Sequence, residues 1–230
     1  MDNHDDFYTN LEIQLKDFIY NSEFEFIDLY TYLYNYSTTI QKKKTEDCRK
    51  DLILFYNTIF ERINIILNNY NLDILEHIVN SDDKLKLFVN KYNTYNHNLK
   101  WLNKLTEFIN NETKKLNSIY EKIDYNKYGL QIWYKNVTLN VSKYINSIII
   151  YYLDYDKYDL NETDNETIFY LNEIIDTIYF AVNKQIIDQK QFETNFGNSV
   201  FDFIDTNIIK LSSSLQHLYP NNYLNLIDKY

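Results

Sequence analysis

The chain has 230 residues with two glycines, one proline and a single cysteine, Cys48, and its formal net charge is −10. So little glycine and proline leaves few means for tight hairpins and phosphate-binding loops, which favours an all-α fold. The acidic balance argues against nucleic acid and anionic membranes as partners, and one cysteine forms neither an internal disulfide nor a thiolate metal site.

The N-terminal residues, "MDNHDDFYTN", are acidic where a secretory signal would be basic and then apolar. The longest apolar stretch, "YINSIIIYYL", is too short to cross a bilayer. With the lone cysteine, these features predict a soluble protein of the cytoplasm or nucleus. Frequent Asn, Ile, Lys and Tyr are typical of an AT-rich genome, such as that of a large DNA virus.

Residues 26–39, "FIDLYTYLYNYSTT", predict a helix with two apolar faces. One stripe holds Phe26, Tyr30 and Tyr34, with Ile27 and Thr31 beside them. The other stripe holds Leu29, Leu33 and Tyr36. A helix that packs on one side needs a single stripe, so the second must meet another helix of the chain or a partner protein.

Further helices are predicted by apolar residues at helical spacing and by the polar breaks between them. The longest buried face comprises Leu52, Phe55, Tyr56, Ile59, Phe60, Ile63, Ile66, Leu67 and Tyr70. Predicted connections lie at 41–50, 80–84, 93–98, 154–167, 195–199 and 219–222. Ser81 or Asp82, and Thr163 or Asp164, are the predicted N-caps of the helices that follow. No linker rich in Gly, Pro or Ser separates two halves, which favours one continuous array of about eight to ten helices.

No pattern in the sequence indicates catalysis. The histidines, His4, His77, His97 and His217, have no metal-ligand spacing. Gly129 and Gly197 are too few for a nucleotide-binding loop or a nucleophile elbow. Carboxylate pairs such as Glu23 with Glu25 and Asp154 with Asp156 are typical of a solvated surface. We therefore expect a protein that is not an enzyme and that uses no cofactor or metal.

The segment "DLYTYLYNYSTT" resembles the second helix in the N-terminal domain of cullins, particularly the SCF-type cullin. Further segments resemble the family in the same order. "LILFYNTIFERINIILNNY" is similar to the third helix, and "FVNKYNTYNHNLKWLNKLTEFINNE" is similar to the segment in which a Lys-x-Leu-Asn run opens the fifth. "IYEKIDYNKYGLQIWYKNVTLNVSKYINSII", with Trp133 and Lys135, resembles the start of the second repeat, and "FETNFGNSVFDFIDTNIIKLSSSL" resembles the E-x-F-E-x-x-F region.

The resemblance implies an elongated stack of about two five-helix cullin repeats, at residues 1–120 and 121–230. The chain ends at "YLNLIDKY", before the C-terminal cullin domain that binds the RING protein, so no RING partner is expected. In the family, the second and fifth helices dock a BTB/POZ-fold adaptor, which carries an F-box protein in SCF ligases. The short basic connection after the second helix departs from the longer insert of the SCF-type cullin.

Carried over by position, the adaptor-facing residues would be Phe26, Ile27, Tyr30, Thr31, Tyr34, Lys104 and Phe108. Leu29, Leu33, Leu102 and Leu105 would be their core partners. The implied function is a cullin mimic that binds the adaptor and competes with the host's cullin. One alternative is a scaffold subunit of an active ligase whose RING function another chain supplies, with a second surface around 196–215. Another is a helical-array protein with another partner. A last one is a purely structural helical array whose resemblance to cullins is accidental, in which Phe26, Tyr30 and Tyr34 are buried within the chain.

Overall fold

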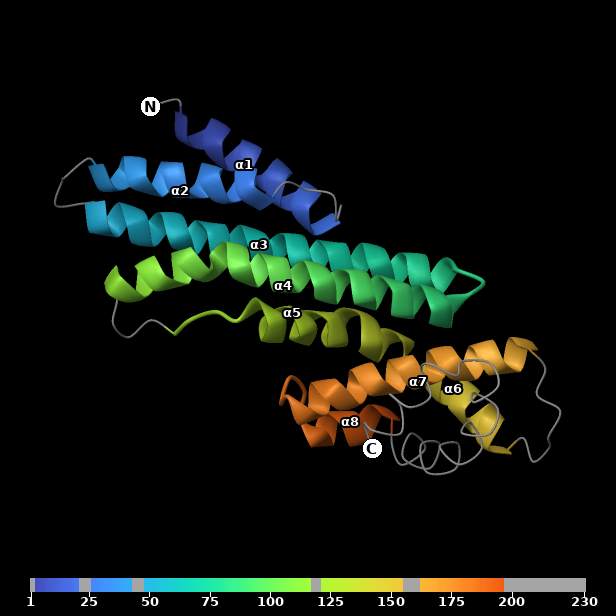
Figure 1. Ribbon diagram of the computed structural model, residues 1–230. Coiled ribbons are helices and arrows are strands. Elements are labelled where there is room, and N and C mark those ends of the chain that lie inside the picture. The colour runs from blue at the N-terminus through green and yellow to red at the C-terminus, as the bar shows by residue number, and fades with distance from the viewer. Residues whose placement is uncertain (1–2, 21–25, 43–47, 117–120, 155–161, 197–230) are drawn as a thin grey trace. The chain divides into compact units, whose positions relative to one another are not determined.

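A computed structural model describes residues 3–20, 26–42, 48–116, 121–154 and 162–196 of the chain. Within these ranges every regular element is a helix (Figure 1), which confirms the all-α prediction. The elements are α1 (Asn3–Tyr20), α2 (Phe26–Lys42), α3 (Cys48–Asn80), α4 (Lys84–Leu116), α5 (Tyr125–Trp133), the π-helix η1 (Tyr134–Thr138), α6 (Leu139–Asp154), α7 (Glu162–Asn183) and α8 (Gln189–Phe196).

Helix α3 contains the predicted buried face and extends it. All nine apolar positions predicted between Leu52 and Tyr70 are buried, and the same face continues through Ile74 and Ile78. The helix has 33 residues, so it is about 50 Å long at 1.5 Å per residue. This length lets one helix support several neighbours along its side.

The predicted connection at 93–98 is wrong, because these residues lie inside α4. Asn and Thr are weak helix formers, but packing overrides their propensity here. Tyr95 is fully buried, and the buried Asn98 side chain donates a hydrogen bond to the Ile19 carbonyl oxygen at 3.0 Å. The run Lys100 to Asn103, which the resemblance placed at the start of a fifth helix, likewise lies in the middle of α4.

The structure differs from both predicted N-cap positions. The backbone N–H of Lys86 donates to the Asp83 carboxylate at 3.3 Å, so Asp83 caps α4 in place of Ser81 or Asp82. Helix α7 begins at Glu162, which puts the predicted caps Thr163 and Asp164 in its first turn. The predicted break at 219–222 lies outside the described residues, as do residues 43–47 of the break at 41–50, residues 155–161 of that at 154–167 and residues 197–199 of that at 195–199.

The chain divides into two compact units. The first comprises residues 1–82 and 90–137, and the second comprises 83–89 and 138–230. The sequence predicted a division between 120 and 121, whereas the structural one follows Val137. Helix α5 belongs to the first unit because its buried side chains, among them Tyr125 and Trp133, pack within it.

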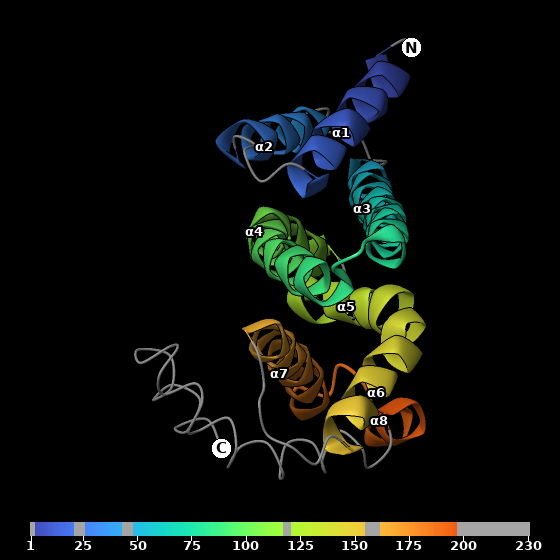
Figure 2. The ribbon, with the colours of Figure 1, turned by 90° about the vertical axis from the view of Figure 1, so that its right-hand side faces the viewer.

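In the first unit, α1 and α2 both pack against α3 (Figures 1 and 2), and α5 packs on α3 as well. The Phe7 ring of α1 stacks on the Tyr36 ring of α2 with centroids 3.6 Å apart. Helix α5 approaches α4 closely at Gly129, where a Cβ atom would lie 2.3 Å from Leu99 Cδ2. Glycine at this position therefore allows α5 to seat on α4.

The second unit is held together by contacts among α6, α7, α8 and the first turn of α4. The Asn146 side chain of α6 donates to the Asn195 carbonyl oxygen of α8 at 2.7 Å. The Lys86 ammonium forms an ion pair with Glu166 of α7 at 3.2 Å. Among the described helices of both units, none has the length and apolar character needed to cross a membrane.

Candidate protein-docking surface

Helix α2 has the two faces that its sequence predicts. Leu29 and Leu33 are fully buried, whereas Ile27 is 73% exposed and Tyr34 is 52% exposed. The predicted core partners on α4, Leu102 and Leu105, are also buried. One face of α2 therefore anchors the helix in the first unit, and the other carries rings toward the surface.

The rings of α2 form a ladder along the exposed face. The centroids of Phe26 and Tyr30 lie 6.0 Å apart, and those of Tyr30 and Tyr34 lie 6.3 Å apart, both in stacked arrangements. Residues four apart on a helix project over one another, so this spacing follows directly from the sequence. Stacking restricts each side chain before any partner binds.

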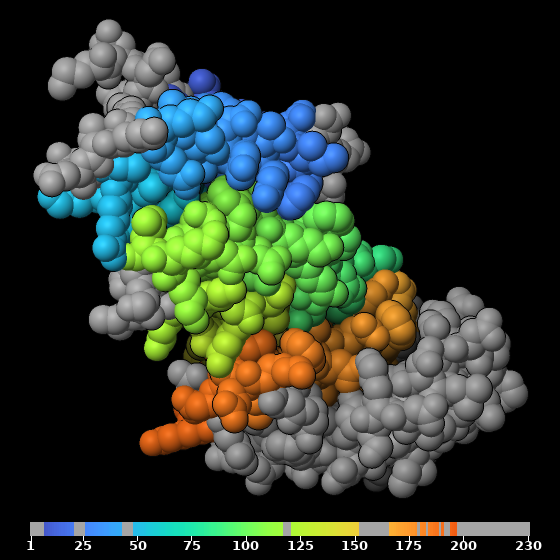
Figure 3. Space-filling view, turned by 60° about the vertical axis from the view of Figure 1, so that its left-hand side comes forward, coloured from blue at the N-terminus to red at the C-terminus, as the bar shows by residue number. Residues whose placement is uncertain are grey.

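Helix α4 brings two further rings against this ladder. Trp101 packs on Phe26 at a centroid distance of 5.4 Å. Phe108 meets Tyr30 edge-on at 5.1 Å and Tyr34 at 6.3 Å. Two stretches that are far apart in the sequence thus build one cluster of rings, and Figure 3 shows α2 (blue) and α4 (green) adjoining on this side of the first unit.

The seven residues predicted from the resemblance all lie on α2 and α4. Five of them contact this cluster, namely Phe26, Tyr30, Tyr34, Lys104 and Phe108, and Ile27 and Thr31 follow Phe26 and Tyr30 on α2. Phe26, Tyr30 and Phe108 are half-buried, while Thr31 and Lys104 are exposed like Ile27 and Tyr34. We define the aromatic surface as these residues together with Trp101: Phe26, Ile27, Tyr30, Thr31, Tyr34, Trp101, Lys104 and Phe108.

Trp101 was missed by the sequence analysis, although it links the two helices. The Lys104 ammonium lies over the Trp101 ring, 4.3 Å from its centroid, which is a cation–π contact. The Trp101 indole N–H donates to His97 Nε2 at 3.1 Å. The signal that was available is spacing, because Trp101, Lys104 and Phe108 follow an i, i+3, i+7 pattern on α4.

The surface has the make-up of a protein-docking site. Tyr, Trp and Phe supply large and rigid contact areas, and the exposed Tyr34 hydroxyl and Lys104 ammonium supply polar groups at the edge. No group of three or more His, Cys, Asp or Glu side chains in the described residues is placed to hold a metal ion.

The alternatives left open by the sequence fare differently. A helical array in which Phe26, Tyr30 and Tyr34 are buried is wrong on that point, because none of the three is buried. The second surface expected around 196–215 lies outside the described residues except for Phe196, which is 1% exposed.

No family model, no curated protein and no solved structure matches the chain in comparisons with known proteins. The resemblance to cullins stays a prediction that rests on the quoted segments.

Proposed function

We propose that this protein binds a BTB/POZ-fold adaptor of SCF-type ubiquitin ligases through the aromatic surface and competes with a cullin for that adaptor. The observation that supports the proposal is the convergence of the predicted residues. Tyr30 and Tyr34 of α2 were selected from one segment and Phe108 of α4 from another, and their rings are in contact.

The arrangement of the rings suits tight binding. Interfaces of standard size bury about 1,600 Å² in total, and a few aromatic anchors near the centre carry most of the binding free energy. Phe26 and Tyr30 are already held by stacking, so their ordering costs little entropy when a partner arrives. The exposed apolar side chain of Ile27 would then add apolar surface that is removed from water only in the complex.

The mechanism is occupancy and involves no catalysis. Two proteins that use the same face of an adaptor exclude each other, so bound adaptor is withdrawn from the cullin. An F-box protein already held by the adaptor would be withdrawn with it. The extent of inhibition then depends on relative affinity and on the abundance of the two competitors.

The first experiment is calorimetric titration of this protein with the purified SCF adaptor, alone and bound to an F-box segment. Saturable binding is expected, and Tyr30→Ala should weaken it by about 2 kcal/mol, or roughly 30-fold in Kd, because a central anchor is lost. Ile27→Ala should also weaken binding of the adaptor, and Leu54→Ala is the matched control. Both residues are exposed aliphatics, at 73% and 66%, but Leu54 lies on α3 outside the aromatic surface.

The proposal fails if no adaptor of BTB/POZ fold binds, or if Leu54→Ala weakens binding as much as Ile27→Ala. Competition is tested separately by adding this protein to a preformed complex of adaptor and cullin N-terminal domain. Displacement of the cullin supports competition. Increased ubiquitin transfer in the presence of a RING protein and an E2 enzyme would instead favour the scaffold alternative.

A further inference from the structure

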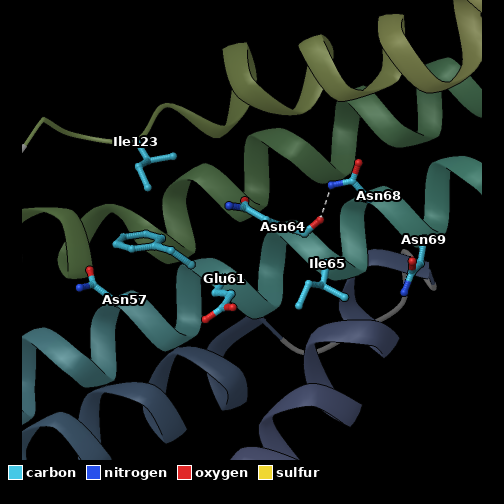
Figure 4. A pocket seen from close by; sticks show the side chains of 8 residues that line it. Asn57, Glu61, Asn64, Ile65, Asn68, Asn69 and Ile123 are labelled. Atoms are coloured by element: carbon cyan, nitrogen blue, oxygen red, sulfur yellow. Dashed lines mark hydrogen bonds between the residues drawn. The ribbon is translucent and has the colours of Figure 1, made fainter.

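A groove of about 540 Å³ lies in the first unit between α3 and residues 121–124, which lead into α5 (Figure 4). In Figure 4, Ile123 projects toward α3, and Asn64 and Asn68 lie on the side of α3 nearer to it. Among the described residues, the lining is rich in carboxamide side chains and has a single charged residue, Glu61. The lining residues are Asn57, Phe60, Glu61, Asn64, Ile65, Asn68, Asn69 and Ile123.

The wall of this groove shows how the protein holds an extended backbone. The Asn110 side chain pairs twice with Ile123, because its Nδ2 donates to the Ile123 carbonyl at 2.9 Å and its Oδ1 accepts from the Ile123 N–H at 3.0 Å. Asn103 Oδ1 accepts from the Tyr125 N–H at 3.0 Å. Asp124 between them has extended dihedral angles, φ −93° and ψ 102°. A carboxamide group carries one acceptor oxygen and two N–H donors. It can therefore make the hydrogen bonds that a neighbouring β-strand would make to an extended backbone.

On its α3 side the groove also presents carboxamide groups that can form hydrogen bonds with a backbone. Asn64 Oδ1 is buried and accepts no hydrogen bond from the described part of the chain. Asn68 differs, because it donates to the Asn64 carbonyl at 2.8 Å and accepts from Asn136 at 3.0 Å. Asn57 and Asn69 are exposed at either end of the groove. A buried acceptor needs a donor, and the half-buried Asn64 side chain would gain one by turning its carboxamide toward the N–H of an incoming peptide.

The spacing and charge of the lining indicate the form of the occupant. Asn57 and Asn69 are twelve residues apart, or about 18 Å along the helix, which five or six residues of extended chain would span. Phe60 and Ile123 offer apolar contact for alternate side chains of such a segment. Glu61 would attract a basic side chain, as would the net charge of −10.

We propose that this groove binds an extended peptide segment of a partner protein, with a backbone N–H on Asn64 and a Lys or Arg side chain against Glu61. The site is separate from the aromatic surface, because none of its lining residues belongs to α2 or α4. It therefore does not depend on the adaptor proposal, and either can fail without the other.

The test is selection of a displayed library of random eight-residue peptides on the full chain, with counter-selection on the double variant Glu61→Gln/Asn64→Leu. Recovered peptides are expected to share a Lys or Arg. Labelled synthetic copies, measured by fluorescence anisotropy, should bind about tenfold more weakly to Glu61→Gln and to Asn64→Leu. N-methylation of the backbone in the middle of the peptide should weaken binding similarly, because an N–H donor is lost.

Matched controls are Glu76→Gln on α3 and Asn93→Leu on α4, whose side chains are exposed and lie outside the groove. Both should bind the selected peptides as the unaltered chain does. The proposal is overturned if selection yields no peptide that loses affinity for Glu61→Gln, if acidic peptides bind as well as basic ones, or if N-methylation has no effect. Because Glu61 is exposed, its substitution should leave the helical circular dichroism unchanged, so lost binding reports on the groove.

Discussion

The first unit contains two clusters of aromatic rings with similar ring contacts and opposite burial. In one cluster the Trp133 ring stacks on Tyr95 at a centroid distance of 5.2 Å. In the other, Trp101 packs on Phe26 at 5.4 Å. Yet Trp133 is 2% exposed and Trp101 is 38% exposed. Contacts between rings therefore do not distinguish a core cluster from a surface cluster, whereas the exposed fraction of the rings does.

The hydroxyl groups of the two clusters differ in the same way. Tyr95 Oη donates to the Gly129 carbonyl at 2.8 Å and accepts from Asn71 Nδ2 at 3.1 Å, so its polar atom is satisfied inside the protein. Tyr34 is 52% exposed, and water can solvate its hydroxyl. A buried hydroxyl specifies one packing arrangement, whereas an exposed one is available to a partner.

The largest difference is expected between the two tryptophans. Trp133→Ala should lower the free energy of unfolding by about 4 kcal/mol, because it removes a buried ring and leaves a cavity. Trp101→Ala should cost less, about 2 kcal/mol, because 38% of the residue already meets water and no closed cavity is left. Denaturant unfolding followed by far-ultraviolet circular dichroism measures both. Equal losses would show that the aromatic surface belongs to the core.

Alkaline pH should act on the buried cluster through Tyr92, whose ring meets Trp133 edge-on at a centroid distance of 5.6 Å. Burial raises the pKa of Tyr92 to about 12, from an ordinary value of 10.0. Below pH 10 the Tyr92 hydroxyl is protonated in both the folded and the unfolded state, so this group does not change the free energy of unfolding with pH. Between pH 10 and 12 the unfolded chain ionises first, so the folded state should lose about 3 kcal/mol from this group.

The measurement is the unfolding free energy of Tyr92→Phe and of the unaltered chain between pH 8 and about 12. The variant should lose less stability across this interval, because phenylalanine has no proton to release. Tyr56, whose pKa burial also raises to about 12, retains its share of the alkaline loss in both proteins. Parallel profiles for the two proteins would contradict the assignment to Tyr92.

The sequence predicted what depends on spacing alone. The stripes of α2 follow from positions four apart, and the buried leucines Leu29 and Leu33 lie where the pattern puts them. The segment 93–98 was misjudged because Asn and Thr are common in loops, while Tyr95 and Asn98 are fixed here by contacts with distant residues. Local propensity cannot report such contacts.

The candidate sites were predictable in different degrees. The resemblance selected Tyr30 and Phe108, but only the packing of α2 beside α4 shows that Trp101 completes their surface. The groove between α3 and residues 121–124 was not predicted, because its wall depends on hydrogen bonds from the Asn110 side chain to the backbone of Ile123, thirteen residues further along the chain. The sequence contains many asparagines, so no single asparagine stands out until the fold places its side chain beside a distant stretch of backbone.

The smallest contrast is between two tyrosine hydroxyls. Tyr95→Phe should lower the unfolding free energy by about 1 to 2 kcal/mol, because it deprives Asn71 Nδ2 and the Gly129 carbonyl of a buried partner. Tyr34→Phe should change it by less than about 0.5 kcal/mol, because water solvates the exposed hydroxyl. Both variants keep the ring, so denaturant unfolding isolates the oxygen. A loss at Tyr34 equal to that at Tyr95 would mean that its hydroxyl serves the fold and not a partner.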